Sequence, residues 1–152
     1  GSRVSTFYEE GNVYHIDFTY PYCSEMREAF IRASENLSVP IRKSGTYVCV
    51  NGPRLETAKE IEFFSKIGAD VVGMTAMPEA SLARELELCL SGLSIVTNYA
   101  AGISKERLTT SEVIETMKES MENIKLLIRE FLNLIPQSRI CSCKDALKDA
   151  KI

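Results

Sequence analysis

The sequence predicts an α/β fold, in which short buried strands alternate with longer amphipathic helices. Two observations support this class. Short apolar runs of strand composition recur along the chain, and stretches with apolar residues at helical spacing separate them. The runs are short and continuously apolar, as expected of parallel strands that are covered on both faces of a sheet.

The first predicted elements are a strand, a helix and a second strand. Residues 13–19 have strand composition, and Pro21 opens a stretch with apolar residues at helical spacing. The run 45–51 is rich in β-branched and aromatic residues and stops at the Gly-Pro pair 52–53. These boundaries predict a second strand that ends where a loop begins.

The next helix has signals at both ends. Thr57 followed by Glu60 is a capping-box pattern, and Gly68 is a typical terminator after the apolar positions of this helix. The run 70–74 (Asp-Val-Val-Gly-Met) then predicts another buried strand. Strand, helix and strand thus form a unit expected to have a parallel sheet.

The second half of the chain predicts a helix from Pro78 to Leu90, a strand at 93–97, and a long final helix. Thr109 and Glu112 are placed to cap that last helix. Its apolar stripe is expected to face the core and contains Ile114, Met117, Met121, Ile124, Ile128 and Phe131.

Composition limits the classes of function. With 152 residues, 45% hydrophobic and 26% charged, the chain is expected to be one globular domain. Lysine and arginine are scattered among acids at a net charge of −3, so nucleic acid is not an expected partner. No apolar run is long enough for a membrane span and no leader is apparent, which favours a cytoplasmic protein.

The five cysteines divide into two groups. Three in apolar surroundings (Cys23, Cys49 and Cys89) are interpreted as buried thiols. Cys141 and Cys143 follow the linker 136–139 and are expected on a tail, either as reduced thiols or in a disulfide. No metal is expected, because two sulfurs without a nearby second pair do not complete a zinc site.

Candidate binding residues follow the three predicted inner strands. In open α/β sheets ligands bind beyond the carboxyl ends of the strands. The segments there are 52–57, 74–75 and 98–99, which together offer a carboxylate, a hydroxyl, a carboxamide and apolar side chains. Such a set suits a flat, mostly uncharged heterocycle. Taken singly, each residue also has an ordinary structural explanation as a helix-dipole acid, a turn hydroxyl or a strand end.

The motifs at these positions resemble one family. GPRLET (52–57), GADVVGMT (68–75), PE (78–79) and TNY (97–99) are similar, in order and spacing, to the trimeric purine nucleoside phosphorylases and methylthioadenosine phosphorylases. The resemblance runs from Arg3 to Leu134, so 1–135 is interpreted as the C-terminal part of such a domain and 136–152 as linker and Cys-Ser-Cys tail. The tail further resembles archaeal methylthioadenosine phosphorylases that contain disulfides.

The resemblance implies a fold and an activity. The fold would be part of a three-layer structure with a mixed, largely parallel central sheet and flanking helices. The reaction would be phosphorolysis of a purine nucleoside to free base and pentose 1-phosphate, with phosphate as co-substrate and no cofactor. Charge grows on the departing purine, so donors to its N7 and O6 would stabilise the transition state.

Roles for six residues are implied in the same way. Asn98 matches the catalytic amide that contacts O6 and N7, and Glu56 matches the acid that accepts from N1–H. The remaining substrate-binding positions are Leu55 against the base, Met74 along the ribose, Thr75 at the phosphate, and His15, which would reach a neighbouring subunit's site. A lone structural histidine is the other interpretation of His15.

The identities at two of these positions indicate a 6-oxopurine. Adenine-specific members of the family have aspartate where this chain has Asn98, whose amide can donate to O6. Leu55 replaces a frequent phenylalanine, which weakens stacking on the base. Ala100 replaces an aspartate of the adenine-specific members, which agrees with the same preference.

The chain lacks sequence that resembles the family's N-terminal part, with its glycine-rich phosphate loop. A homo-oligomer, trimer or hexamer, with the N-terminal part as a second chain is therefore the expected enzyme. A chain truncated or cleaved from a longer one, or an inactive relic, would look the same. The alternatives in function are a non-catalytic purine-binding or assembly module and a hydrolytic nucleosidase of the related superfamily.

Overall fold

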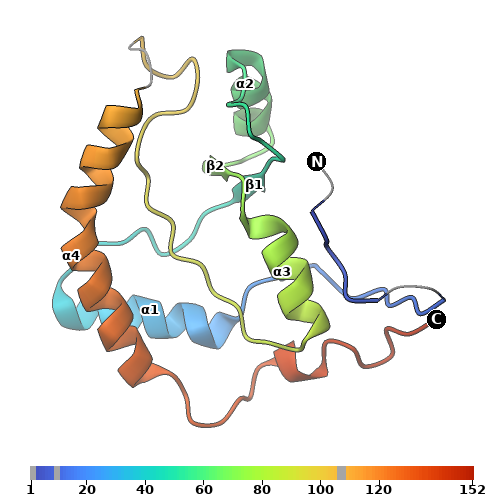
Figure 1. Ribbon diagram of the computed structural model, residues 1–152. Helices are drawn as coiled ribbons and strands as arrows, with labels where there is room; N and C mark the ends of the chain where they lie inside the picture. Colours follow the sequence, from blue (N-terminus) through green and yellow to red (C-terminus); the bar gives the residue numbers. More distant parts are fainter. Residues whose placement is uncertain (1–2, 9–10, 106–108) are drawn as a thin grey trace.

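The computed structural model describes residues 3–8, 11–105 and 109–152. Helices and strands alternate through most of the chain, which confirms the α/β class. The elements in order are α1 (Ser24–Leu37), β1 (Tyr47–Cys49), α2 (Ala58–Lys66), β2 (Val71–Gly73), α3 (Ala76–Glu85), α4 (Thr110–Leu134) and the short 3₁₀ helix η1 (Ser142–Asp145) (Figure 1).

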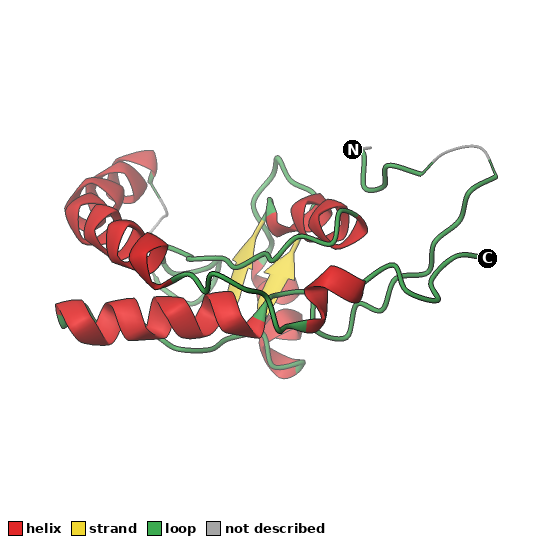
Figure 2. Cartoon of the chain, turned by 90° about the horizontal axis from the view of Figure 1, so that it is seen from below, coloured by secondary structure: helices red, strands yellow, loops and turns green. Residues whose placement is uncertain are grey.

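The sheet is a parallel pair, as predicted. Tyr47 lies opposite Val71 and Cys49 opposite Gly73, and α2 makes the crossover between the two strands. One more bond, from the Val50 N–H to the Gly73 carbonyl at 2.9 Å, extends the pairing toward the carboxyl ends. Figure 2 shows that the two strands are flanked by helices.

Two predicted strands are not strands among the described residues. The segment 93–97 is irregular, because no other described strand forms a hydrogen-bonded ladder with it. The segment 13–19 makes only an isolated antiparallel bridge, between Tyr14 and Lys151 near the C-terminus. Strand composition alone is insufficient here, since a strand exists only through a neighbour that satisfies its backbone groups.

The capping predictions for α2 and α4 are confirmed. The Thr57 side chain accepts from the Glu60 N–H while the Glu60 carboxylate accepts from the Thr57 N–H, a complete capping box. Thr109 similarly accepts from the Glu112 N–H. Beyond α2, Gly68 has a φ of 87°, a left-handed conformation that glycine adopts with little strain.

The predicted start of α3 at Pro78 agrees with the continuous part of the helix, but its predicted end was wrong. The helix begins two residues before Pro78 but is interrupted at Met77, whose φ of −115° and ψ of 127° are not helical. Proline disfavours the helical conformation in the residue before it, which explains the break. At the other end the helix stops at Glu85 rather than Leu90, because Glu87 has a left-handed φ of 54°.

The hydrophobic core lies between α1 and α4. Ala29 and Ala33 of α1 are fully buried against Leu127 and Phe131 of α4. The rings of Phe30 and Phe131 stack with centroids 3.8 Å apart. The small alanine side chains let the two helices approach closely, so the aromatic rings can fill the remaining space.

The predicted stripe of α4 is only partly correct. Phe131 is buried, but Ile114 and Ile128 are exposed, and Leu127 takes the buried position instead. The helix therefore also carries exposed apolar side chains, which are Ile114, Leu126, Ile128 and Leu132. Periodicity alone did not separate the apolar positions that pack against α1 from those that stay exposed.

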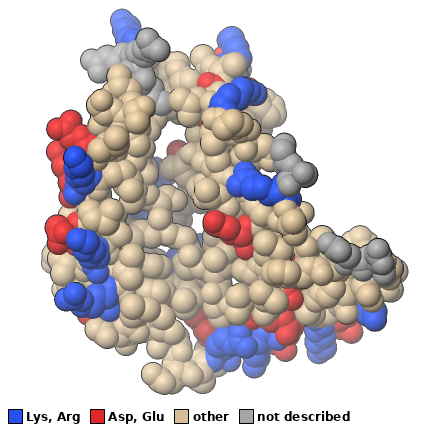
Figure 3. Space-filling model, viewed as in Figure 1, with Lys and Arg blue, Asp and Glu red and all other residues tan. Residues whose placement is uncertain are grey.

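The C-terminal residues are folded rather than a mobile tail. Cys143, Ala146 and Ala150 are buried, and the Ala150 carbonyl accepts from the His15 N–H at 2.8 Å. Among the described residues no helix has the length and apolar character to cross a membrane. On the face shown in Figure 3, acidic and basic side chains are interspersed along α4 and the lower edge.

Candidate functional site

The loops after the two strands meet at one edge of the sheet. β1 and β2 are parallel, so the segments 52–57 and 74–75 leave from the same side. Gly52 has a φ of 62°, and a Cβ there would lie 2.5 Å from the Met74 sulfur. Glycine is therefore needed at position 52 both for the backbone conformation and for the close approach of Met74.

The third predicted loop approaches the same region. A Cβ on Gly102 would lie 2.6 Å from the Cβ of Ala58, the first residue of α2. The turn that contains Gly102 follows Asn98 and Tyr99 and is closed by a bond from the Ile103 N–H to the Ala100 carbonyl. The segment after Thr97 is thus tied to the start of α2, next to the loop that carries Glu56.

Ion pairing fixes the shape of the first loop. The Arg54 guanidinium donates to both carboxylate oxygens of Glu60, at 2.9 and 2.7 Å. Bonds from Arg54 and from the Thr57 backbone and hydroxyl hold the pKa of Glu60 down at about 2. Because Arg54 donates both bonds to Glu60, its role here is structural. Glu56 is then the carboxylate of the loop that remains available to a ligand.

The other predicted side chains around this edge are open to contact. Glu56 is half-buried, and Leu55 is 57% exposed. Thr75 is exposed at the start of α3, and its side chain makes no capping bond to the helix. A carboxylate, an apolar side chain and a hydroxyl are therefore available to a ligand at this edge.

Asn98 is oriented by its neighbours. Its Oδ1 accepts from the Thr97 hydroxyl at 2.7 Å, and its Nδ2 donates to the Tyr99 carbonyl at 2.9 Å. A carboxamide nitrogen has two N–H donors, so one remains for a ligand. The side chain is thus prepared to donate a hydrogen bond, and the Thr97 hydroxyl helps to fix that orientation.

His15 lies at a different cavity, of about 330 Å³, whose walls include Met77, Ser81, Arg84 and Glu85. None of the other five predicted site residues lines it. Sequence reasoning missed the two charged residues of this wall. Glu85 accepts from the Phe7 N–H at 2.6 Å, and Arg84 donates to the Asp17 carbonyl at 3.2 Å. Both are buried, so they anchor the N-terminal segment on α3.

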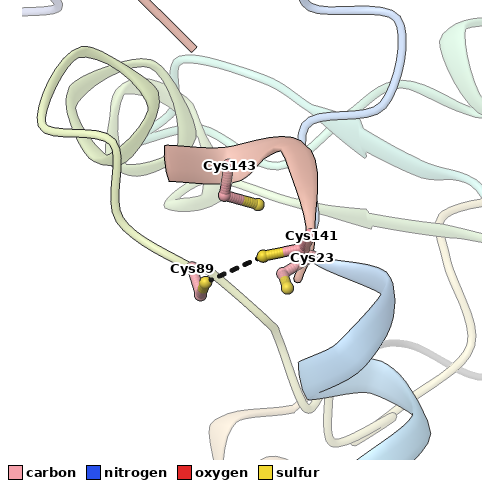
Figure 4. Close-up of side chains that lie close together, drawn as sticks. All are labelled: Cys23, Cys89, Cys141 and Cys143. Carbon is pink, nitrogen blue, oxygen red and sulfur yellow. Dashed lines mark hydrogen bonds between the residues drawn. The ribbon is translucent and has the colours of Figure 1, made fainter. Parts of the chain in front are cut away.

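A second unexpected feature is a cluster of four thiols, formed by Cys23, Cys89, Cys141 and Cys143 (Figure 4). Their sulfur atoms all lie within 4.8 Å of one another. The sulfur atoms of Cys89 and Cys141 are 3.4 Å apart. The premise that Cys141 and Cys143 have no second pair of sulfurs nearby was wrong, since residues far apart in sequence come together.

The thiols of this cluster differ in acidity. Burial raises the pKa of Cys89 to about 12 and that of Cys143 to about 11, and bonds from neighbouring sulfurs add to both shifts. Burial also raises the pKa of Cys23, but bonds from the Met26 backbone and the other cysteines outweigh it and leave that pKa lowered. Of these three cysteines, Cys23 is therefore the one whose thiol ionises most readily.

Sequence comparison gives a consistent family. Residues 1–133 match the model of the Phosphorylase superfamily. The chain is 55% identical to a probable S-methyl-5'-thioinosine phosphorylase of Thermodesulfovibrio yellowstonii, over 99% of this chain and 57% of that protein. It is 54% identical to the 6-oxopurine nucleoside phosphorylase of Pyrococcus furiosus, over 98% of this chain and 59% of that protein.

Solved structures agree on the fold. A methylthioadenosine phosphorylase from an antarctic soil metagenomic library superposes with a TM-score of 0.87 at 30% identity, covering 99% of this chain and 54% of that one. A double mutant of adenosine/methylthioadenosine phosphorylase from Schistosoma mansoni, with adenine bound, gives 0.91 at 26% identity, covering 99% and 62%. The chain thus spans less than two thirds of the length of these relatives.

Proposed function

Because this chain belongs to the phosphorylase superfamily, we propose that it is the purine-recognising part of a purine nucleoside phosphorylase that prefers 6-oxopurines. The names of the two relatives above support both the reaction and the base, since one is named a 6-oxopurine nucleoside phosphorylase and the other a probable S-methyl-5'-thioinosine phosphorylase. The single structural observation that favours it is the meeting of the Glu56 and Met74 loops beside the segment that carries Asn98.

Asn98 and Glu56 would read the base. The free N–H of Asn98 donates to a purine acceptor, and the Glu56 carboxylate accepts from N1–H, which only a 6-oxopurine carries. Adenine would leave Glu56 facing an unprotonated N1, and Asn98 facing an amino group. Two stranded polar groups are sufficient for strong discrimination between bases.

The remaining residues would hold the sugar and the phosphate. Met74, packed on Gly52, lies along the ribose, and Leu55 covers the base with an exposed aliphatic side chain. Thr75 offers its unused hydroxyl to phosphate. His15, at its own cavity, would serve the site of a neighbouring subunit in a cytoplasmic homo-oligomer, trimer or hexamer.

In the reaction a phosphate oxygen forms a bond to C1′ of the ribose while the bond from C1′ to purine N9 breaks. The electron pair of that bond moves onto the purine, which takes up a proton and leaves as the free base. Pentose 1-phosphate is the second product. Asn98 contributes by donating to the purine as negative charge develops, because a preoriented donor stabilises the transition state more than the ground state.

We further propose that most phosphate contacts come from a separate N-terminal part. The matched relatives are longer than this chain, which covers 57% and 59% of them. Arg54 is engaged by Glu60, so Thr75 is the main phosphate ligand that these loops offer. One hydroxyl provides much less than a loop of backbone amides with a guanidinium.

The experiment measures release of hypoxanthine from inosine by the 152-residue chain, with and without phosphate, and with and without the N-terminal part of a close relative. We expect turnover only with both additions. Turnover by the chain alone would show that no second part is needed, and turnover without phosphate would indicate a nucleosidase. Calorimetric binding of hypoxanthine with no turnover under any condition would support the non-catalytic module.

A further inference from the structure

We propose that Cys23, Cys89, Cys141 and Cys143 form a zinc site in the reduced protein, with all four sulfurs as ligands. None of the six residues assigned to the purine nucleoside belongs to this cluster. Four thiolates are a common ligand set of structural zinc, whereas catalytic zinc usually keeps one position open. The site would therefore stabilise the fold and take no part in phosphorolysis.

The spacing of the sulfurs fits a single ion. In a tetrahedral site with Zn–S bonds of about 2.3 Å, the sulfur atoms are about 3.8 Å apart. The four Sγ atoms here lie within 4.8 Å of one another, and Cys89 and Cys141 are at 3.4 Å. Figure 4 shows the side chains converging from three segments of the chain. Small rotations about the Cα–Cβ bonds would equalise these distances.

The backbone around the cluster is held in place. Cys23 is the N-cap of α1, and its N–H donates to the Leu90 carbonyl at 2.7 Å, which joins the segment of Cys89 to the start of the helix. The C-terminal segment is attached by bonds from Arg139 to the Glu87 carbonyl and from the Ile140 N–H to Glu25. Three segments are thus positioned before any ion binds, which favours binding.

The local charge suits an anionic complex. Zinc with four thiolates has a net charge of −2, which is costly to bury without compensation. Cys23 stands at the positive N-terminus of α1, a helix of 14 residues. Arg27 and Arg84 line a cavity of about 320 Å³ together with three of the cysteines. The Arg84 Nε is buried without a hydrogen-bond partner among the described residues, so this guanidinium has an unused donor.

Disulfide formation is the competing chemistry of the same four thiols. Two disulfides would release four protons and four electrons, and so require an oxidant. Zinc binding oxidises nothing, and it only displaces the thiol protons into water. In the structure all five cysteines of the chain are free thiols, and the four sulfurs of the cluster form one group rather than two bonded pairs.

The test is metal analysis of the untagged full chain, expressed with added zinc and purified anaerobically with reductant and without chelators. We expect about one zinc per chain by mass spectrometry. Replacement by cobalt should give the visible absorption and thiolate-to-cobalt charge-transfer bands of a tetrahedral sulfur site. Cys143→Ser should lose stoichiometric zinc, whereas Cys49→Ser, which changes the one cysteine outside the cluster, should retain it.

Three results would overturn the proposal. Wild-type protein could contain far less than one zinc per chain with four reactive thiols, or carry a disulfide within the cluster despite the reductant. Zinc could also bind equally to wild type and Cys143→Ser, which would place it elsewhere. If Cys143→Ser does not fold, the cobalt spectrum of the wild type still decides, because the charge-transfer bands require sulfur ligands.

Discussion

The loops proposed to bind the purine, called the purine loops below, and the thiol cluster are built in opposite ways. The purine loops come from consecutive elements, at the ends of β1 and β2 and at the segment after Thr97, and their motifs are contiguous in sequence. The thiol cluster joins residues 23, 89 and 141–143, and the contact between Cys89 and Cys141 crosses 52 residues. A site that follows strand ends is therefore visible in a sequence, and a site made by the return of the C-terminus is not.

The two regions also differ in how far they depend on residues outside this chain. The purine loops are exposed at Leu55 and Thr75 and would need further chain to enclose a nucleoside. The thiol cluster has all four of its ligands within the described residues, two of them buried. Metal binding should consequently survive in the isolated chain, while phosphorolysis should not.

The largest expected effect is on base choice. Asn98→Asp replaces a donor with an acceptor and should reverse the preference between inosine and adenosine in the complete enzyme. Each stranded buried polar group costs about 1–3 kcal/mol, so the ratio of kcat/KM values should change by roughly 100-fold or more. Tyr99→Phe is the matched control, because Asn98 contacts only the backbone carbonyl of Tyr99.

Glu56→Ala sharpens the same measurement. It removes the acceptor for N1–H and should weaken inosine more than adenosine. An inosine-to-adenosine ratio that stays the same in both variants would contradict base recognition by these two residues. In either variant the zinc content should remain at the wild-type level, since the thiol cluster shares no residue with the purine loops.

A smaller effect, on the free energy of unfolding, is expected when a side chain is added where the turn after Tyr99 contacts α2. Gly102→Ala places a Cβ against Ala58 and requires a non-glycine residue at a φ of 80°. Overpacking and left-handed strain together should lower the free energy of unfolding by about 2–4 kcal/mol. Urea titration of the wild type and the variant measures this change in the free energy of unfolding. Gly92→Ala is the control, since a Cβ there would meet Tyr22 at an ordinary distance of 3.7 Å, and a similar loss of stability in this variant would refute the contact between Gly102 and Ala58.

The local elements around the first region could be predicted from the sequence and the thiol cluster could not, for physical reasons. Local rules located the capping box of Thr57 and the stop at Gly68, because both depend on neighbours within a few residues. The prediction of a strand at 93–97 was wrong, because a strand forms only beside a neighbouring strand, which can lie far away in the sequence. The thiol cluster was missed for the same reason, although the Cys-x-Cys pair and Cys23 near the start of a predicted helix were signals in the sequence.

Removal of zinc should lower the free energy of unfolding by an amount similar to, or slightly smaller than, that expected for Gly102→Ala. A ligand that binds only the folded state stabilises it by about 2.7 kcal/mol at a free concentration a hundredfold above its Kd. Unfolding of the reduced protein in urea, with buffered zinc or with a chelator, measures the difference. Cys49→Ser should show the same dependence on zinc, and Cys143→Ser should show none. If the chelator still lowered the stability of Cys143→Ser, the stabilisation by zinc would not come from the thiol cluster.

The smallest effect concerns the first purine loop and its dependence on pH. The pKa of Glu60 is about 2, against an ordinary value of 4.5, so the folded state favours the ionised carboxylate. Its contribution to stability is complete above about pH 4.5 and is lost as the pH falls toward 2. Glu60→Gln should therefore lower stability at neutral pH, and its difference in stability from wild type should become smaller between about pH 4.5 and 2.

Urea midpoints at several pH values measure this difference. Glu115→Gln, at an exposed position of α4, is the control for loss of a negative charge. The Glu60 side chain is partly exposed and its partner Arg54 is exposed, so the difference in stability should be small and reduced by salt. A difference that is constant between pH 5 and 2 would show that the carboxylate of Glu60 does not hold the loop through its charge.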